Sequence, residues 1–191
     1  SKSIFTRGLF FKKTEILNRS SYFADFKKLK EREIQKGDEI ISVAAGFPTT
    51  VNPIVQFGAI PVFVDVKIPT YNMNENLVEA AITKKTKAIV PVHFTGYMTN
   101  MPKLLKISKK YNLPIVEDAC QSILGSINHK NAGTWGEFGA FSLHPLKNIN
   151  VWSDGGVIVT NSKKYYNHLR LLRNHGLVDR DNVAICGYNS R

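Results

Sequence analysis

An alternation of short apolar runs with amphipathic stretches, starting at Gly37, constrains the fold more than any other feature of the chain. The apolar runs are rich in Val and Ile, and they predict strands at residues 39–44, 61–66, 88–93, 114–119, 140–143 and 157–160. The stretches between them predict helices at residues 48–57, 74–82, 101–111 and 163–174. Strands that alternate with helices form βαβ units, so we expect an α/β fold: a mostly parallel sheet with helices on both faces.

The first 36 residues do not continue this pattern. Residues 22–33 could form an amphipathic helix, and the residues before them carry no clear signal. We therefore divide the chain into a poorly matched N-terminal segment, residues 1–36, and one α/β domain, residues 37–191. A chain of this length and composition can bury one substantial core.

The basic composition, with a formal net charge of +11, raises the question of a nucleic-acid partner. Many of the basic residues fall in short pairs on predicted helix faces, such as Lys109-Lys110, and they do not alternate with aromatic residues along one element. We therefore expect solvated helix faces and no nucleic-acid partner. A basic rim could still attract a phosphorylated substrate.

The residues give no support for a membrane protein, a secreted protein or a metal-binding protein. No apolar run reaches the roughly 18 residues of a transmembrane helix, and residues 1–11 lack the apolar core of a secretory signal. The two cysteines, Cys120 and Cys186, are too few for a disulfide framework and indicate reduced thiols in a cytoplasmic protein. No cluster of His, Cys and Asp has metal-ligand spacing, so we expect no metal.

Three polar side chains follow the ends of neighbouring predicted strands, where ligands of parallel sheets collect. Asp118 ends the strand PIVED, Ser142 ends the run GAFS, and Lys147 lies five residues further on. Alone, Lys147 could be a solvated surface residue and Asp118 could cap a helix. Together they match what pyridoxal phosphate requires: an amine for its aldehyde, a carboxylate for its ring nitrogen and a hydroxyl for its phosphate.

At this point the chain resembles the DegT/DnrJ/EryC1/StrS aminotransferases, enzymes that act on nucleotide-linked keto-sugars. The resemblance runs from about Gly37 to Arg191, and it rests on ordered motifs rather than on any single one. The motifs are GDEIIS at 37–42, GFPTTVNPI at 46–54, GAIPVFVDV at 58–66, TYNMN at 70–74, TKAIVPVHFTG at 86–96, VEDACQS at 116–122, AGTWGEFGAFSLHPLKN at 132–148, DGGVIVTN at 154–161, LRNHG at 172–176 and GYNSR at 187–191.

The resemblance implies the large domain of a fold-type I transferase that depends on pyridoxal phosphate, and it assigns roles to matched positions. Lys147 would carry the cofactor and act as its acid and base, and Asp118 would pair with the pyridine nitrogen. Gln121 would contact the phenolic oxygen, Ser142 the phosphate, and Phe47 would stack on the ring. From the residues alone, Phe47 could instead be plain core, Ser142 a turn residue, and Gln121 a partner for a backbone group.

Two further positions are implied at the end of the chain. Asn189 matches a residue that crosses the interface of a homodimer to the neighbour's phosphate. Arg191 lies in the same loop and would approach the substrate. His93 and His144 are interpreted as core or supporting residues rather than as bases.

The implied activity is the transfer of an amino group from glutamate to a keto carbon of a nucleotide-linked sugar, in amino-sugar or surface-polysaccharide biosynthesis. Two alternatives stay open. One branch of the family carries histidine in place of the lysine and dehydrates keto-deoxysugars, and residues 46–53 resemble that branch too. The other alternative is a truncated, non-catalytic remnant.

The remnant hypothesis rests on what the chain does not match. The family's C-terminal small domain is not represented, and residues 18–21, Asn-Arg-Ser-Ser, lack the glycine of the family's upstream phosphate loop. We expect such a partial chain to expose apolar surface and to associate through it.

Overall fold

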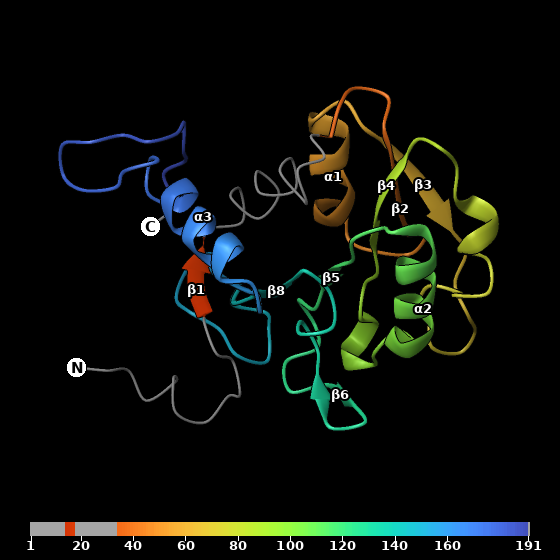
Figure 1. Ribbon diagram of the computed structural model, residues 1–191. Helices are drawn as coiled ribbons and strands as arrows, with labels where there is room; N and C mark the ends of the chain where they lie inside the picture. The colour runs from red at the N-terminus through yellow and green to blue at the C-terminus, as the bar shows by residue number, and fades with distance from the viewer. Residues whose placement is uncertain (1–13, 18–33, 191) are drawn as a thin grey trace.

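Two sheets joined edge to edge form the centre of the molecule in the computed structural model, which describes residues 14–17 and 34–190 (Figure 1). The strands are β1 Thr14–Leu17, β2 Glu39–Val43, β3 Ile60–Val64, β4 Thr86–Val90, β5 Val116–Asp118, β6 Ser126–Ile127, β7 Lys130–Asn131, β8 Phe138–Ser142 and β9 Gly156–Val159. The helices are α1 Pro48–Gln56, α2 Met101–Tyr111 and α3 Lys163–Arg173, with short 3₁₀ turns η4 Glu79–Ala81 and η5 Phe94–Gly96.

The strand order confirms a mostly parallel sheet. One sheet has the order β3-β2-β4, the other β1-β9-β8-β5, and parallel bridges from Ile89 to Ile115 and from Val92 to Asp118 connect the two. The pairs β2–β3, β2–β4 and β5–β8 are parallel, whereas β9 runs antiparallel to both β8 and β1. The order places β4, β5 and β8 in the middle, so their carboxyl ends meet at one edge of the sheet.

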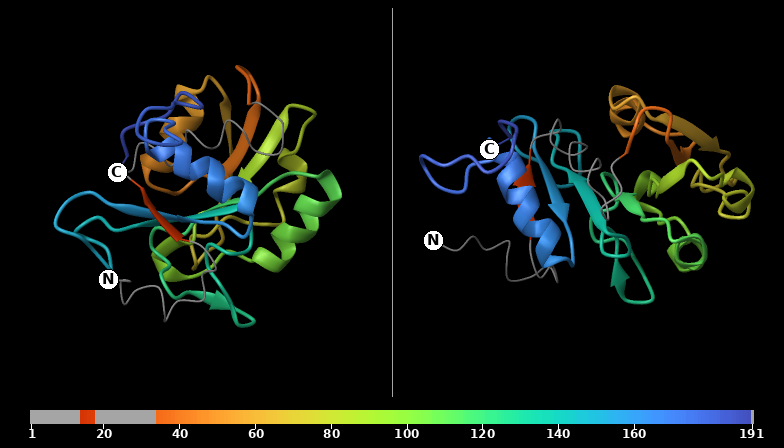
Figure 2. Two further views of the ribbon diagram at one scale, coloured as in Figure 1. Left: turned by 60° about the vertical axis from the view of Figure 1, so that its left-hand side comes forward. Right: turned by 45° about the horizontal axis from the view of Figure 1, so that its top comes forward.

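Helices cover both faces of this sheet, as predicted. Along β2 the side chains alternate: Ile41 belongs to the core beneath Leu104 and Ile107 of α2, and Ile40 to the core shared with Ile54 of α1 and Leu169 of α3. This period of two is the reason that each strand is apolar throughout. Figure 2 shows α1 and α3 on one side of the strands and α2 on the other.

Local signals fix the ends of two helices. The Asn100 side chain accepts a hydrogen bond from the Lys103 N–H at the start of α2, and the helix ends at Asn112 in the left-handed conformation (φ 52°, ψ 41°). The Ser162 hydroxyl accepts from the Tyr165 N–H at the start of α3. Both helices have the boundaries that the sequence predicted to within one residue.

The helix predicted at residues 74–82 is wrong. The structure has only the 3₁₀ turn Glu79–Ala81 there, preceded by turns. The Asn74 side chain accepts from the Asn76 N–H at 3.1 Å, and the Leu77 N–H donates to the Asn74 carbonyl at 3.0 Å. Asparagine side chains compete with helical hydrogen bonds in this way, so the segment closes as successive turns.

Strand β1 is a second difference, since the sequence carried no signal for it. Its four residues pair antiparallel with β9 at the edge of the sheet. The amphipathic helix predicted at residues 22–33 lies outside the described residues.

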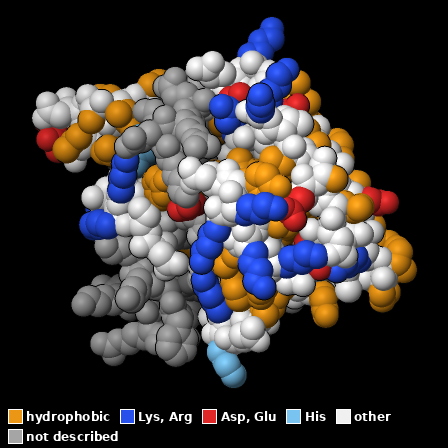
Figure 3. Space-filling model, turned by 45° about the vertical axis from the view of Figure 1, so that its right-hand side comes forward, with side chains coloured by type: hydrophobic (Ala, Val, Ile, Leu, Met, Phe, Trp, Pro, Cys, Tyr) orange, Lys and Arg blue, Asp and Glu red, His pale blue; other side chains and the backbone are white. Residues whose placement is uncertain are grey.

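Basic side chains are spread over the face that carries α2, with acidic and apolar side chains between them (Figure 3). Lys110 of α2 forms an ion pair with Glu79 at 2.7 Å, and Lys67 forms one with Glu75 at 2.5 Å. Part of the positive charge is therefore compensated locally. Within the described ranges, no helix is both long and apolar enough to cross a membrane.

Candidate active site

Asp118 ends β5 in the middle of the sheet and is only 7% exposed. Its N–H donates to the Pro91 carbonyl and its own carbonyl accepts from the His93 N–H, both at 2.9 Å. The carboxylate is held as firmly: Oδ2 accepts from the Thr50 hydroxyl at 2.6 Å, and Oδ1 from the Cys120 N–H at 3.1 Å. A carboxylate oxygen can accept two hydrogen bonds, so each oxygen of Asp118 keeps capacity for one further donor.

Phe47 immediately precedes α1 and is 60% exposed, so its interpretation as plain core is wrong. Pro48 follows it and starts the helix, with Phe47 itself in an extended conformation (φ −80°, ψ 139°). Phe47 lines a cavity of about 240 Å³ at the ends of β2 and β4 together with Thr50 and Val92. Phe47 therefore lies beside the helix that contacts Asp118, at the wall of this cavity.

Lys147 lies in a turn beyond the end of β8. The Lys147 N–H donates to the His144 carbonyl at 2.9 Å, and Pro145 occupies the second position of this turn. Strand β8 pairs in parallel with β5, and Ala140 lies opposite Asp118. The turn that carries Lys147 therefore follows the carboxyl end of β8, on the same side of the sheet as the carboxyl end of β5. Lys147 is half-buried, and within residues 14–17 and 34–190 its amino group has no hydrogen-bond or ion-pair partner.

Ser142, the last residue of β8, forms a hydrogen bond within the same turn. Its hydroxyl oxygen accepts from the His144 N–H at 3.2 Å, which is the turn role left open by the sequence. A hydroxyl that accepts one bond still has its hydrogen to donate, so this contact is compatible with a phosphate ligand.

Gln121 follows β5 and supports the turn η5 after β4. Its side-chain oxygen accepts from the Thr95 N–H at 2.8 Å, where Thr95 adopts a positive φ of 53°. Gln121 therefore does satisfy a backbone group, while its amide nitrogen remains a donor for a ligand.

Asn189 is exposed. It lies far beyond Asp118 in the sequence, on a segment that contacts the end of α3. It bridges Asn174 in antiparallel fashion, and the Ser190 N–H donates to the Arg173 carbonyl at 2.9 Å. Arg191 lies outside the described residues.

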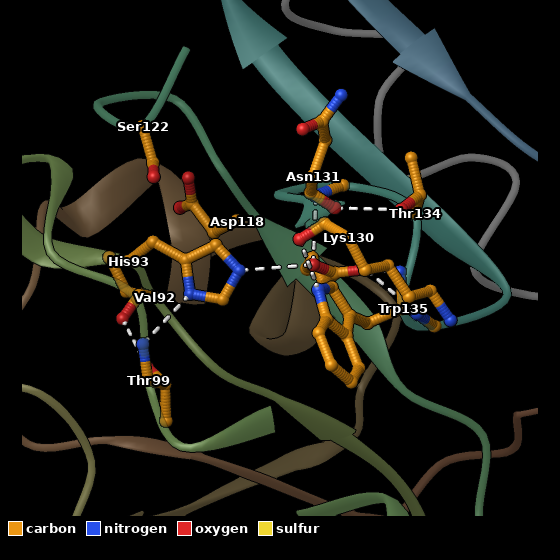
Figure 4. Close-up of polar contacts among 12 residues, drawn as sticks. Val92, His93, Thr99, Asp118, Ser122, Lys130, Asn131, Thr134 and Trp135 are labelled. Atoms are coloured by element: carbon orange, nitrogen blue, oxygen red, sulfur yellow. Dashed lines mark hydrogen bonds and ion pairs between the residues drawn. The ribbon is translucent and has the colours of Figure 1, made fainter. Parts of the chain in front are cut away.

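A second buried carboxylate, Glu117, points away from Asp118 because neighbouring residues of a strand face opposite sides. His93 donates to it from Nε2 at 3.0 Å, since Nδ1 accepts from the Thr99 N–H. Figure 4 shows the hydrogen bond between the Thr99 N–H and the His93 ring. The network confirms that His93 is a core residue that supports its neighbours. The sequence patterns did not single out Glu117 or Thr50. The available signal for Glu117 was the glycine-rich stretch AGTWG, whose backbone N–H groups bind it. The available signal for Thr50 was the threonine pair that follows Phe47-Pro48.

Comparison with known proteins identifies the family to which the chain belongs. The sequence model of the DegT/DnrJ/EryC1/StrS aminotransferase family matches residues 26–191, and the chain belongs to this family. It is 44% identical to the lipopolysaccharide biosynthesis protein RfbH of Salmonella typhimurium over 149 residues, which are 78% of this chain and 34% of that protein. It is 41% identical to the UDP-N-acetyl-3-dehydro-alpha-D-glucosamine 3-aminotransferase of Acidithiobacillus ferrooxidans over 163 residues, 85% of this chain and 44% of that protein.

Solved structures give the same result for the fold. A DegT/DnrJ/EryC1/StrS aminotransferase from Brucella abortus superposes with a TM-score of 0.86 at 30% identity, over 95% of this chain and 50% of that one. A GDP-4-keto-6-deoxymannose-3-dehydratase with a trapped PLP-glutamate geminal diamine superposes with a TM-score of 0.88 at 30% identity, over 98% of this chain and 54% of that one. The fold is therefore that of the fold-type I large domain, and the chain spans about half the length of these solved relatives.

Pyridoxal phosphate is the cofactor of this family, and the residues present fit it. The carboxylate of Asp118 is buried and already oriented by two donors, and its remaining lone pairs can accept a further hydrogen bond. A protonated pyridine nitrogen is a donor of this kind. Lys147 supplies an amine that has no partner among the described residues and that follows the strand next to Asp118, and Phe47 supplies an exposed ring.

Proposed function

We propose that this chain is the cofactor-binding part of a pyridoxal-phosphate-dependent aminotransferase that moves an amino group from glutamate to a keto carbon of a nucleotide-linked sugar. The observation that carries the proposal is the placement of a lysine and an oriented, buried carboxylate at one edge of the sheet. The names of two relatives, the UDP-linked 3-aminotransferase and a dTDP-3-amino-3,4,6-trideoxy-alpha-D-glucose transaminase, support the substrate class.

Each residue of the candidate site would have its own role in binding the cofactor. Lys147 would hold the cofactor, Asp118 would hold the proton on its ring nitrogen, and Phe47 would stack on its ring. Ser142 would donate to the phosphate, and the Gln121 amide to the phenolic oxygen. When bound, pyridoxal phosphate supplies an aldehyde and a ring that accepts the electrons of a broken C–H bond.

Lys147 would also move the proton. With the cofactor and the amino donor bound, its amino group would take the proton from the α-carbon of the donor. In the second half of the reaction the same amino group would give a proton to the sugar carbon that receives nitrogen. An amine without a competing ion-pair partner is suited to both steps, because it can lose and regain a proton without breaking a bond to the protein.

A homodimer would complete the site. Asn189 is exposed on a segment that the backbone bonds to α3 hold in place, so its side chain is available to a neighbouring subunit. We propose that it reaches the phosphate in the partner's site, and that the protein works in the cytoplasm, where nucleotide-linked sugars are found.

The proposal is tested by mixing the protein with pyridoxal phosphate, glutamate and a panel of nucleotide-linked keto-sugars. We expect 2-oxoglutarate and an amino sugar in equal amounts for one member of the panel, and neither product with the Lys147→Ala variant. The Lys163→Ala variant, which changes a lysine at the start of α3, is the matched control and should remain active.

A sugar dehydratase is the second candidate, favoured by the TM-score of 0.88 to a dehydratase structure. The lysine at position 147 argues against it, since that branch of the family uses histidine there. Product that forms only with an electron-donating reductase, and without net glutamate consumption, would establish the dehydratase. A protein that takes up no cofactor would establish the remnant.

A further inference from the structure

Thr50 is a buried hydroxyl whose hydrogen bond joins two segments far apart in the sequence. It lies in the first turn of α1, is 2% exposed, and its Oγ1 lies 2.6 Å from Oδ2 of Asp118, 68 residues further along the chain. Threonine inside a helix usually bonds back to a carbonyl of the preceding turn. Here the hydroxyl instead leaves the helix and meets the strand end.

The direction of this bond is determined by its partner. An ionised carboxylate only accepts hydrogen bonds, so the Thr50 hydroxyl donates. With the Cys120 N–H on Oδ1, each carboxylate oxygen then has one donor from the protein. Two donors on different oxygens fix the rotation of the carboxylate plane, and with it the direction in which the remaining lone pairs point.

We propose that Thr50 is a positioning residue that aims the Asp118 carboxylate at the ring nitrogen of the cofactor; this rests on the proposed function. The same helical turn carries Phe47, because the Thr50 N–H donates to the Phe47 carbonyl at 3.0 Å. The start of α1 therefore sets the ring that would stack on the cofactor and the orientation of the carboxylate together. Both residues also line the same cavity.

The experiment compares the affinities of two cofactors. One is pyridoxal phosphate, and the other is an analogue in which carbon replaces the ring nitrogen, so that Asp118 has nothing to bind. Thr50→Val removes the hydroxyl at nearly constant shape, whereas Thr50→Ser retains it. We expect Thr50→Val to weaken pyridoxal phosphate roughly ten- to a hundredfold, as for a hydrogen bond to a charged group, and to leave the analogue unchanged.

The Thr50→Ser variant should bind both cofactors as the wild type does, and Asp118→Asn should show the same selective loss as Thr50→Val. Adding Thr50→Val to Asp118→Asn should cost nothing further. Equal losses for both cofactors, or no loss for either, would overturn the positioning role. If Thr50→Val does not fold, as judged by thermal unfolding, Thr50→Ala takes its place. A wild type that binds neither cofactor would contradict the proposed function itself, and the positioning role with it.

Discussion

His93 Nε2 and Glu117 Oε2 lie 3.0 Å apart, and neither side chain is exposed to solvent. The same carboxylate accepts from three backbone N–H groups of one loop: Gly133 at 2.8 Å, Trp135 at 2.6 Å and Gly136 at 2.7 Å. Glu117 thereby connects β5 with the end of β4 and with the loop that leads into β8. The candidate site lies on the other side of the same strand, so its geometry depends on this buried carboxylate.

Glu117→Gln should therefore destabilise the fold strongly. The glutamine amide would turn a donor toward backbone donors, and breaking a buried charged network typically costs about 3–5 kcal/mol. Denaturant unfolding monitored by circular dichroism measures the change. Glu79→Gln, at an exposed ion pair, is the control and should have little effect. Equal stabilities of the two variants would contradict the role assigned to Glu117.

Gly139→Ala should be destabilising for a related reason. A Cβ at Gly139 would overlap the backbone of Gly133 in the loop held by Glu117. Because backbone atoms surround the position, neither segment can move aside without disturbing β8. Gly46→Ala is the matched control, since its Cβ would meet only side-chain atoms at 3.7 Å or more. Comparable melting temperatures for the two variants would show that this close approach is unimportant.

Phe47→Ala should weaken cofactor binding several-fold to about tenfold, as expected for the loss of one aromatic stacking contact. The ring is 60% exposed, so the free energy of unfolding should change little. Phe63→Ala is the comparison, because Phe63 is 53% exposed and lines the same cavity from β3. If both variants lose cofactor equally, Phe47 does not stack on it. Fluorescence titration with pyridoxal phosphate measures both affinities.

Acid sensitivity should depend on Glu75. Burial raises the pKa of this carboxyl, but the hydrogen bond and charge of Lys67, with help from Asn100, outweigh it and place the pKa below its ordinary value of 4.5. The ionised form therefore stabilises the fold above pH 4.5, and this contribution is lost as the pH falls through the lowered value.

Glu75→Gln should consequently flatten the decline of stability below pH 4.5. Lys67→Met should do the opposite and move the decline to higher pH, because it leaves the buried carboxylate without its cation. Unfolding curves at a series of pH values distinguish the two. Parallel pH profiles for wild type and both variants would contradict the assignment.

The sequence predicted the sheet well because each buried strand carries its own signal. The Val- and Ile-rich runs of β2, β4 and β5 need no distant partner to be seen, and the rule that ligands collect at strand ends pointed to Asp118 and Lys147. The alternation of Ile40 and Ile41 between two cores then follows from the strand geometry.

Other parts of the fold depend on partners that the sequence does not display. Strand β1 is defined by its pairing with β9, and the turns at residues 74–82 by the competition of Asn74 with a helix. The threonine pair after Phe47-Pro48 is a local signal for a polar side chain, but the partner of Thr50, Asp118, lies 68 residues away and no local pattern could indicate it. Phe47 was ambiguous for the same reason, since its exposure follows from how α1 packs on the sheet.

Borohydride reduction of the protein with pyridoxal phosphate, followed by peptide mapping, tests the central claim most directly. Reduction fixes the cofactor on the lysine that holds it. We expect one labelled peptide containing Lys147, and no specific label in Lys147→Arg. A label on another lysine, or none on the wild type, would contradict it.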